Sequence, residues 1–487
     1  MLIRRALLAL TISAPFWSCA NEVETAAPPN VVVILADDLG IGDLGVYNSE
    51  SKIPTPNLDA LAASGMRFTD AHSPSAVCTP TRYGILTGQY SWRTRLKQGV
   101  FQGEDTNLID VDRVTVADLM HDAGYATGAF GKWHLGLGAL ADGKTNWNEP
   151  LVPGPLEHGF DEFFGIPASL DMAPYLYVRN HAPEQQPTDH VEDSERVRDG
   201  GAGFWRGGPI APDFAHADVL GRIVDEASSF IESRAAASDG KPFFLYLPFT
   251  APHTPWMPSA EFRGRSGAGP YGDFVAMVDD RVGHILSVLD EQGFADDTLV
   301  IFASDNGASW LPEQVEQYQH RANGPWRGQK ADIHEGGHRI PFMVRWPGHV
   351  AAGAVRDQLL CLTDIEASLA GVLGVQLPRD AAEDSFDQSP VWLGSSDAAP
   401  RTAIVSHSSR GLFSIRQDSW KLVLGLGSGG FTPPATVEPE PGGPIGQLFN
   451  LAADPAETTN LYSANPEKVQ ELSALLESYQ AEGRSRP

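Results

Sequence analysis

A series of unbroken apolar runs, separated by segments with helical character, most constrains the fold of this chain. Residues 31–35 are all β-branched or aliphatic, which is typical of a strand buried on both faces of a parallel sheet. Similar strands are predicted over residues 126–130, 243–247 and 298–303. Helices followed closely by a glycine are predicted over residues 58–64, 114–123 and 275–291. This alternation predicts an α/β fold with a large, mostly parallel sheet flanked by helices.

The sequence pattern changes near residue 396. Short strands are predicted over residues 402–406, 412–416 and 420–424, and a last helix over residues 466–481. We therefore expect an N-terminal domain over residues 28–395 and a smaller C-terminal α+β subdomain over residues 396–487, which contains a short antiparallel sheet. A chain of 487 residues is long enough for two such units with sizeable cores.

The charge balance limits the kinds of partner. The sequence has 62 acidic and 35 basic residues, which gives a formal net charge of −27. An acidic surface of this kind repels nucleic acid and anionic membranes, so we expect no nucleic-acid partner. An anionic substrate would need a local cluster of cations to overcome the same repulsion.

The N-terminus has the parts of a secretory signal. Two arginines precede an apolar run over residues 6–17, and small and polar residues follow it, so residues 1–21 are interpreted as a signal peptide. Cys19 is a candidate site for a lipid anchor, and simple cleavage near it is the alternative. The run is too short for a comfortable transmembrane helix, and no later run is long enough. We expect an exported protein that is periplasmic, anchored at the outer membrane or secreted from a bacterium.

Hard oxygen ligands follow two of the predicted strands. Asp37 and Asp38 come after the first strand, and Asp305 and Asn306 come after the fourth. The carboxyl ends of parallel strands are where open α/β sheets place their ligands. Carboxylate and amide oxygens without a neighbouring histidine or cysteine cluster suit Ca²⁺ or Mg²⁺ rather than zinc. The alternative is that these side chains cap helices or face solvent.

Only two cysteines follow the signal segment, which excludes a disulfide framework. Cys361 lies in an apolar stretch and is interpreted as a buried small residue. Cys78 instead opens the segment Cys-Thr-Pro-Thr-Arg, in which Pro80 is predicted at the first position of a helix and Arg82 one turn after Cys78. Helix-end amides and a guanidinium are matched to a tetrahedral anion such as sulfate or phosphate.

These motifs resemble those of the type I sulfatase family. The resemblance rests on Cys-x-Pro-x-Arg at Cys78, the Leu-Thr-Gly that follows it, the early Asp-Asp pair and the late Asp-Asn-Gly, and it covers nearly the whole chain after the signal segment. The chain is similar to arylsulfatase A and to bacterial carbohydrate sulfatases. The resemblance implies an alkaline phosphatase-like fold and a formylglycine (3-oxoalanine) nucleophile made from Cys78 by a formylglycine-generating enzyme. It also implies a site for calcium, with magnesium left open, made by Asp37, Asp38, Cys78, Asp305 and Asn306.

The same resemblance assigns the remaining catalytic residues. Gly-Lys-Trp-His-Leu-Gly at residues 131–136 resembles the segment that offers Lys132 and His134 to the nucleophile and the sulfate, and Lys330 matches a sulfate-contacting lysine. His253 matches the histidine that protonates the leaving oxygen. The implied catalytic set is Cys78, Arg82, Lys132, His134, His253 and Lys330. Singly, each position has a structural alternative as a surface charge or a satisfied polar residue, but their combination at strand ends and loops favours catalysis.

Substrate recognition is encoded less clearly. Ser169 and Asp171 lie in a segment that resembles a loop of arylsulfatase A-like enzymes, which makes them candidate substrate-binding residues. A turn closed by an aspartate side chain is the structural alternative. His72, Trp256 and Trp310 are candidates for lining a sugar-sized pocket, with side-chain packing as the alternative.

The sequence therefore predicts a sulfuric ester hydrolase that removes sulfate from a sulfated sugar or glycan. A phosphodiester or phosphonate monoester hydrolase is one alternative, because related folds use the same nucleophile. A non-catalytic glycan-binding protein is the other alternative, and it applies if Cys78 stays unmodified.

Overall fold

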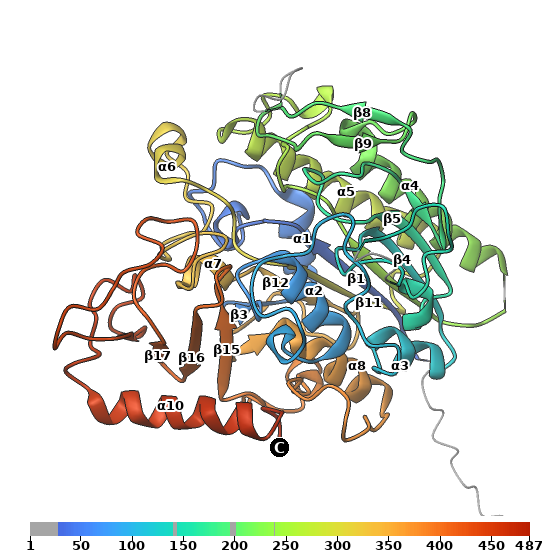
Figure 1. The fold of residues 1–487 in the computed structure, drawn as a ribbon. Coiled ribbons are helices and arrows are strands. Elements are labelled where there is room, and N and C mark those ends of the chain that lie inside the picture. The colour runs from blue at the N-terminus through green and yellow to red at the C-terminus, as the bar shows by residue number, and fades with distance from the viewer. Residues whose placement is uncertain (1–27, 140–143, 195–200, 238) are drawn as a thin grey trace, which may run out of the picture.

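A ten-stranded mixed sheet forms the centre of the molecule (Figure 1). The computed structural model describes residues 28–139, 144–194, 201–237 and 239–487. The predicted signal segment, with Cys19, lies outside these residues. In spatial order the strands are β13 (Ala354–Arg356), β2 (Met66–Phe68), β12 (Phe342–Arg345), β11 (Thr298–Ser304), β1 (Asn30–Ala36), β10 (Phe243–Pro248), β4 (Ala126–Lys132), β5 (Glu162–Ile166), β6 (Val178–Arg179) and β7 (Ala182–Pro183).

The five strands from β11 to β5 run parallel, and they contain the four strands predicted from the sequence. Every residue of β1 is buried, as expected for a strand whose two faces are both covered by helices. Parallel strands place their carboxyl ends at one edge of the sheet, so the segments that follow β11, β1, β10, β4 and β5 all emerge on the same side. The predicted α/β fold is confirmed.

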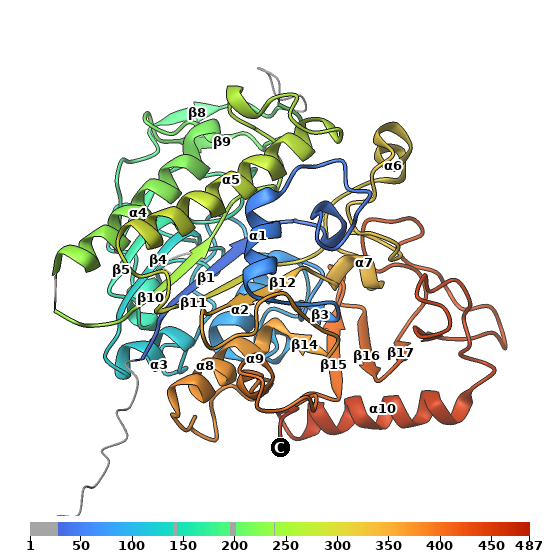
Figure 2. The same ribbon diagram turned by 180° about the vertical axis from the view of Figure 1, so that it is seen from behind.

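Helices cover both faces of the sheet. One face carries α1 (Pro56–Ser64), α4 (Val219–Ala237) and α5 (Gly269–Glu291), which lie in front in Figure 2. The other face carries α2 (Cys78–Thr87), α3 (Val116–Asp122) and α8 (Ile365–Leu373), which lie in front in Figure 1. The smaller elements are α6 (Pro312–Tyr318), α7 (Glu335–His338), α9 (Ser389–Trp392) and two strand pairs, β3 (Ala71–His72) with β14 (Leu360–Cys361) and β8 (Asp189–Val191) with β9 (Gly208–Ile210). None of the helices described is long and apolar enough to cross a membrane.

The C-terminal part forms a separate four-stranded antiparallel sheet. Its strands are β15 (Ala403–His407), β16 (Phe413–Gln417), β17 (Trp420–Val423) and β18 (Gln447–Asn450), in that spatial order. Helix α10 (Pro466–Ala481) packs on this sheet and contributes Leu472 and Leu476 to a core that also contains Ile415 and Leu422. The predicted antiparallel sheet and last helix are confirmed.

A buried ion network joins α7 to the C-terminal sheet. The Lys421 Nζ of β17 lies 3.1 Å from a carboxylate oxygen of Glu335 and 2.9 Å from one of Glu457. Burial alone would raise the pKa of Glu335, but Lys421 and Arg339 outweigh it and hold that pKa well below its ordinary value. Lys421 Nζ also lies 3.1 Å from His338 Nε2. This network fixes α7 against the C-terminal sheet.

Replacing Lys421 with methionine should destabilise the protein by about 3–5 kcal/mol, because buried Glu457 would lose its lysine partner and buried Glu335 would keep only Arg339 as a close cation. Urea unfolding of the purified protein measures this change. The matched control is Lys468→Met, which removes a surface pair with Glu471 at 2.6 Å and should cost less than about 1 kcal/mol. Equal effects of the two substitutions would show that the network does not stabilise the junction.

Candidate active site

Five neighbouring parallel strands each deliver a polar side chain to the same edge of the sheet. Asp37 and Asp38 follow β1, and Asp305 and Asn306 follow β11, its partner in the sheet. Asp38 donates its backbone N–H to Asp305 Oδ1 at 3.2 Å, and Asn306 Nδ2 donates to Asp38 Oδ1 at 2.7 Å. All four residues are buried. The structure thus brings together the four oxygen-bearing residues that the sequence predicted.

Cys78 is the first residue of α2, whose ten residues are all buried. Its Sγ lies 3.5 Å from Asp37 Oδ1 and 3.6 Å from Lys330 Nζ. The predicted position of Pro80 is wrong by two residues, because the helix begins at Cys78 and Pro80 is its third residue. Proline is tolerated there because the first four N–H groups of a helix have no acceptor within the helix. Cys78 therefore remains at the amino end of a helix.

Three buried cations surround the carboxylates. Lys132, the last residue of β4, places Nζ 2.6 Å from Asp37 Oδ2. Arg82, one turn after Cys78, places Nη2 2.9 Å from Asp305 Oδ2. Lys330 Nζ lies 2.6 Å from Asp38 Oδ1. Each carboxylate has its own cation, which offsets much of the cost of burying these charges.

The oxygen ligands nevertheless fit a further cation. Asn306 Oδ1 is buried and accepts no hydrogen bond from the described residues. Burial and the negative charge of Asp37 raise the pKa of Asp305 to about 7. Ligand atoms of Asp37, Asp38, Cys78 and His253 lie within 4.8 Å of one another. An unpaired amide oxygen beside crowded carboxylates is the chemistry of a Ca²⁺ or Mg²⁺ site.

Two histidines face the same centre. His134, just after β4, has Nε2 2.7 Å from the Phe101 carbonyl, while its buried Nδ1 has no partner among the described residues. Burial and the charge of Lys132 lower the pKa of His134 well below its ordinary value, so its ring is neutral. His253 follows β10 and has Nδ1 2.6 Å from the Thr254 carbonyl, while its Nε2 lies 3.7 Å from Asp38 Oδ2.

Several residues of this site have strained backbone conformations. Eight non-glycine residues of the described chain have a positive φ, and three of them belong to the active-site segments: Asp38 at 69°, His134 at 58° and Ala331, next to Lys330, at 76°. Such conformations cost free energy and persist only where the surrounding structure enforces them. The fold therefore holds these side chains in place at the expense of local stability.

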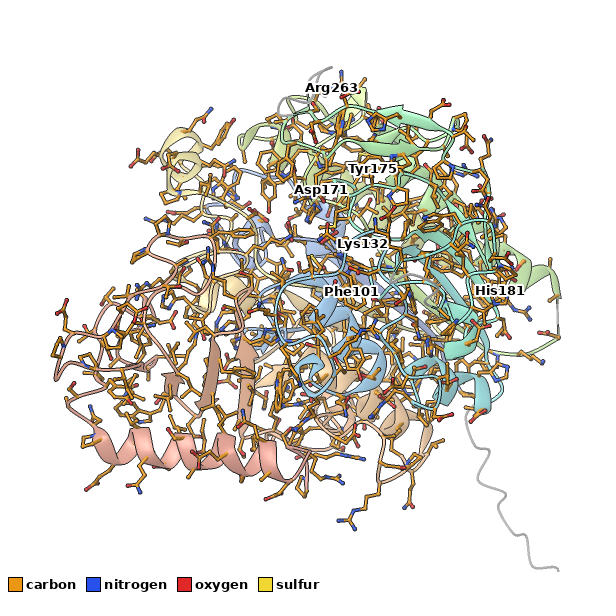
Figure 3. All side chains as sticks on the ribbon, viewed as in Figure 1. Phe101, Lys132, Asp171, Tyr175, His181 and Arg263 are labelled. Carbon is orange, nitrogen blue, oxygen red and sulfur yellow. The ribbon has the colours of Figure 1, made fainter. Side chains whose placement is uncertain are left out.

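A cavity of about 460 Å³ opens over Cys78. Ser169 and Asp171, in the loop after β5, line it, and both Ser169 Oγ and Asp171 Oδ1 are buried without a hydrogen-bond partner in the described chain. Figure 3 shows Asp171, Lys132 and Phe101 one below another in the middle of the view. The cavity also contains residues that sequence analysis missed, namely Phe204, Arg206, Leu311 and Phe431. They lie in loops without a recognisable motif, so no sequence signal pointed to them.

Of the three residues predicted as candidates for lining a pocket, one lines the cavity and two pack elsewhere. Trp256 lines the cavity, as predicted. Trp310 packs against Tyr271 at 4.8 Å between ring centroids instead, and it is not among the residues that line the cavity. His72 lies in the buried ion network, where its Nε2 is 2.8 Å from Asp70 Oδ1. For Trp310 and His72 the packing interpretation is correct.

Comparisons with known proteins agree with this geometry. The sulfatase family profile matches residues 29–375. An N-acetylgalactosamine-6-O-sulfatase of Bacteroides thetaiotaomicron is 36% identical, covering 98% of this chain and 99% of its own, and arylsulfatase A of Homo sapiens is 34% identical, covering 94% of this chain and 88% of its own. A solved sulfatase from work on glycosaminoglycan metabolism by B. thetaiotaomicron has a TM-score of 0.82 at 35% identity, covering 94% of this chain and 100% of its own. The chain therefore belongs to the sulfatase family and is a sulfatase.

Proposed function

We propose that this sulfatase removes sulfate from a sulfated carbohydrate with a formylglycine made from Cys78. The position of Cys78 carries the proposal, since it lies at the amino end of α2 between Lys330 and Asp37 and at the base of a sugar-sized cavity. Burial raises the pKa of the Cys78 thiol in spite of Lys132 and Lys330, so the unmodified thiol would be a poor nucleophile. Oxidation to the aldehyde resolves this difficulty.

A hydrated aldehyde at position 78 would carry two hydroxyl groups on one carbon. One hydroxyl would lose its proton and bond to sulfur while the S–O bond to the sugar breaks and the sugar oxygen takes up a proton, so that residue 78 would carry the sulfate. The other hydroxyl then loses its proton and forms the C=O bond, the C–O bond to the sulfate breaks, and the aldehyde is restored. The buried and unpaired Nδ1 of His134 supports the role of base in this second step.

The three cations would stabilise charge on the sulfuryl oxygens. Arg82, Lys132 and Lys330 are buried and fixed by carboxylates, so they need little rearrangement when charge develops. Asp37, Asp38, Asp305, Asn306 and the oxygen at position 78 would hold calcium, with magnesium as the alternative. A bound divalent cation supplies further electrostatic stabilisation of the sulfate group.

The leaving oxygen of a sugar needs a proton, because an alkoxide is a poor leaving group. We assign this role to His253, and the assignment is supported by its Nδ1, which faces the Thr254 carbonyl, and its Nε2, which faces the centre of the site. We assign Ser169 and Asp171 to binding of sugar hydroxyls, because each has a buried polar atom without a partner among the described residues. The relative named for N-acetylgalactosamine 6-sulfate makes a sulfated hexosamine the first substrate to test.

Export and maturation complete the proposal. Residues 1–21 would act as a signal peptide, with Cys19 as a candidate lipid site, and would direct the enzyme to the periplasm, the outer membrane or the medium. A formylglycine-generating enzyme would be the maturation partner. Residues 28–395 would form the catalytic domain, and residues 396–487 would support the Lys330 segment through the contacts of Lys421.

Calcium should stabilise the wild-type protein against heat, because it binds the folded state only. The free energy of unfolding should rise by about 2.7 kcal/mol when free calcium is at a hundredfold excess over its Kd. This rise should disappear in Asp305→Asn, because the substitution removes one ligand charge. Thermal unfolding with a chelator and with added calcium measures this effect without any turnover. Asp279→Asn is the matched control, because it alters a buried carboxylate that holds α1 rather than this site. A full calcium response in Asp305→Asn would contradict the assigned ligands.

Substitution of His253 by alanine should affect substrates according to their leaving group. A general acid contributes roughly 10²- to 10⁴-fold for a poor leaving group such as a sugar alkoxide, and little for nitrophenolate. Values of kcat for a sulfated hexosamine and for nitrophenyl sulfate therefore separate the role of acid from a merely structural one. Equal losses on both substrates would refute the assignment. A wild-type enzyme that prefers phosphate or phosphonate esters would instead refute the choice of sulfate.

A further inference from the structure

One wall of the cavity contains an ion pair between Asp171 and Arg206, and the proposed function gives Arg206 no role. Arg206 Nη1 binds Asp171 Oδ2, and the Arg206 backbone N–H donates to the Asp171 carbonyl at 3.0 Å. The Asp171 side chain is 3% exposed, whereas the Arg206 side chain is 49% exposed, so the pair extends from the buried wall to the open space of the cavity. The Arg206 guanidinium also lies 5.4 Å from the centre of the Phe204 ring. Arg206 is thus held at one end and accessible at the other.

The segment around Arg206 is docked on the loop that carries His253. Ala202 and Trp256 form two backbone hydrogen bonds, of 3.0 and 2.8 Å, and the Phe204 N–H donates to Thr254 Oγ1 at 3.3 Å. A ligand that touches Arg206 would therefore lie beside the proposed general acid. This is where the sugar ring must lie if its sulfate is at Cys78.

Three polar groups on this wall are available to such a ligand. Within the described residues, Ser169 Oγ and Asp171 Oδ1 have no partner although both are buried, and the outer edge of the Arg206 guanidinium makes no hydrogen bond. Asp171 Oδ1 lies 3.8 Å from His253 Nδ1, which faces the Thr254 carbonyl, so this carboxylate oxygen remains free to accept. Buried polar groups without partners are costly unless a ligand satisfies them.

The charge of the wall indicates the kind of ligand. Arg206 is paired with a buried carboxylate, so the wall offers donors and an acceptor with little net charge. Such a surface fits neutral hydroxyl groups better than a second anion, because a guanidinium fork already paired to a carboxylate gains less from another charge. The opening is apolar as well, since Phe204, Leu311 and Phe431 are 42%, 46% and 53% exposed there. Apolar side chains fit the C–H face of a sugar ring.

We propose that Arg206, anchored by Asp171, is a substrate-binding residue that selects a sulfated pyranose by its neutral hydroxyl groups. The ring would place its hydroxyls against Ser169, Asp171 and the outer edge of Arg206, and its apolar face against Phe204. This inference rests on the proposed function and adds to it a substrate class, namely a sugar whose ring next to the sulfate carries no second charge.

The test compares two substrates in wild type and in Arg206→Ala. N-acetylgalactosamine 6-sulfate has ring hydroxyls, whereas nitrophenyl sulfate has none. We expect Arg206→Ala to lower kcat/KM for the sugar by about 10- to 100-fold, mainly through KM, as expected for loss of a hydrogen bond from a charged group. The same value for nitrophenyl sulfate should change less than about threefold. Arg179→Ala, which alters a half-exposed arginine paired with Glu184 and Glu226, is the control.

Deoxy analogues make the test specific to the contact. Removing the hydroxyl that Arg206 binds should lower kcat/KM for the sugar in wild type but not in Arg206→Ala. An effect on folding would not produce such a coupling. Equal losses on both substrates, or no coupling with any deoxy sugar, would overturn the role of Arg206 while leaving the sulfatase activity in place. If the enzyme preferred sugars with a second anionic group on the ring, and Arg206→Ala abolished this preference, the proposed selection of a neutral ring would be overturned. Failure of matured wild type to cleave either ester would instead refute the proposed function.

Discussion

The active site depends on the balance between three buried carboxylates and three buried cations at one edge of the central sheet. Asp37, Asp38 and Asp305 would repel one another strongly in a low-dielectric interior without Lys132, Lys330 and Arg82. The balance is incomplete, because Asn306 Oδ1 lacks a donor in the described chain and the pKa of Asp305 is raised to about 7. A divalent cation and an anionic sulfate would complete it together, which explains how a protein of net charge −27 can accept an anion.

The rest of the fold holds this cluster of charged side chains in position. Parallel pairing of β1 with β11 and β10, of β10 with β4, and of β4 with β5 brings five chain segments to the same edge. The segment of Lys330 comes from outside this set, and the ion network around Lys421 holds the following helix against the C-terminal sheet. The C-terminal part therefore reaches the active site through these charge pairs and through Phe431, which lines the cavity.

Much of this arrangement was predictable from the sequence, and the exceptions have physical reasons. Buried parallel strands are recognisable because both of their faces are apolar, and the polar residues that follow them mark the strand ends. Recognition of Arg206 and Phe431 was not possible, because each lies in a loop whose position depends on tertiary contacts. The two interpretations of His72 could not be separated, since a histidine in a sequence looks the same whether it faces a ligand or a buried carboxylate. The start of α2 differed from prediction because proline fits any position of the first turn.

The most direct test of the account is mass spectrometry of the tryptic peptide that contains residue 78, combined with assay of the same preparation on a sulfate ester. The protein is expressed with and without a formylglycine-generating enzyme. The account predicts the aldehyde at residue 78 only in the first preparation, together with sulfate release that rises with the fraction of aldehyde. Sulfate release by protein with an unmodified Cys78 thiol, or no release by fully converted protein, would contradict it.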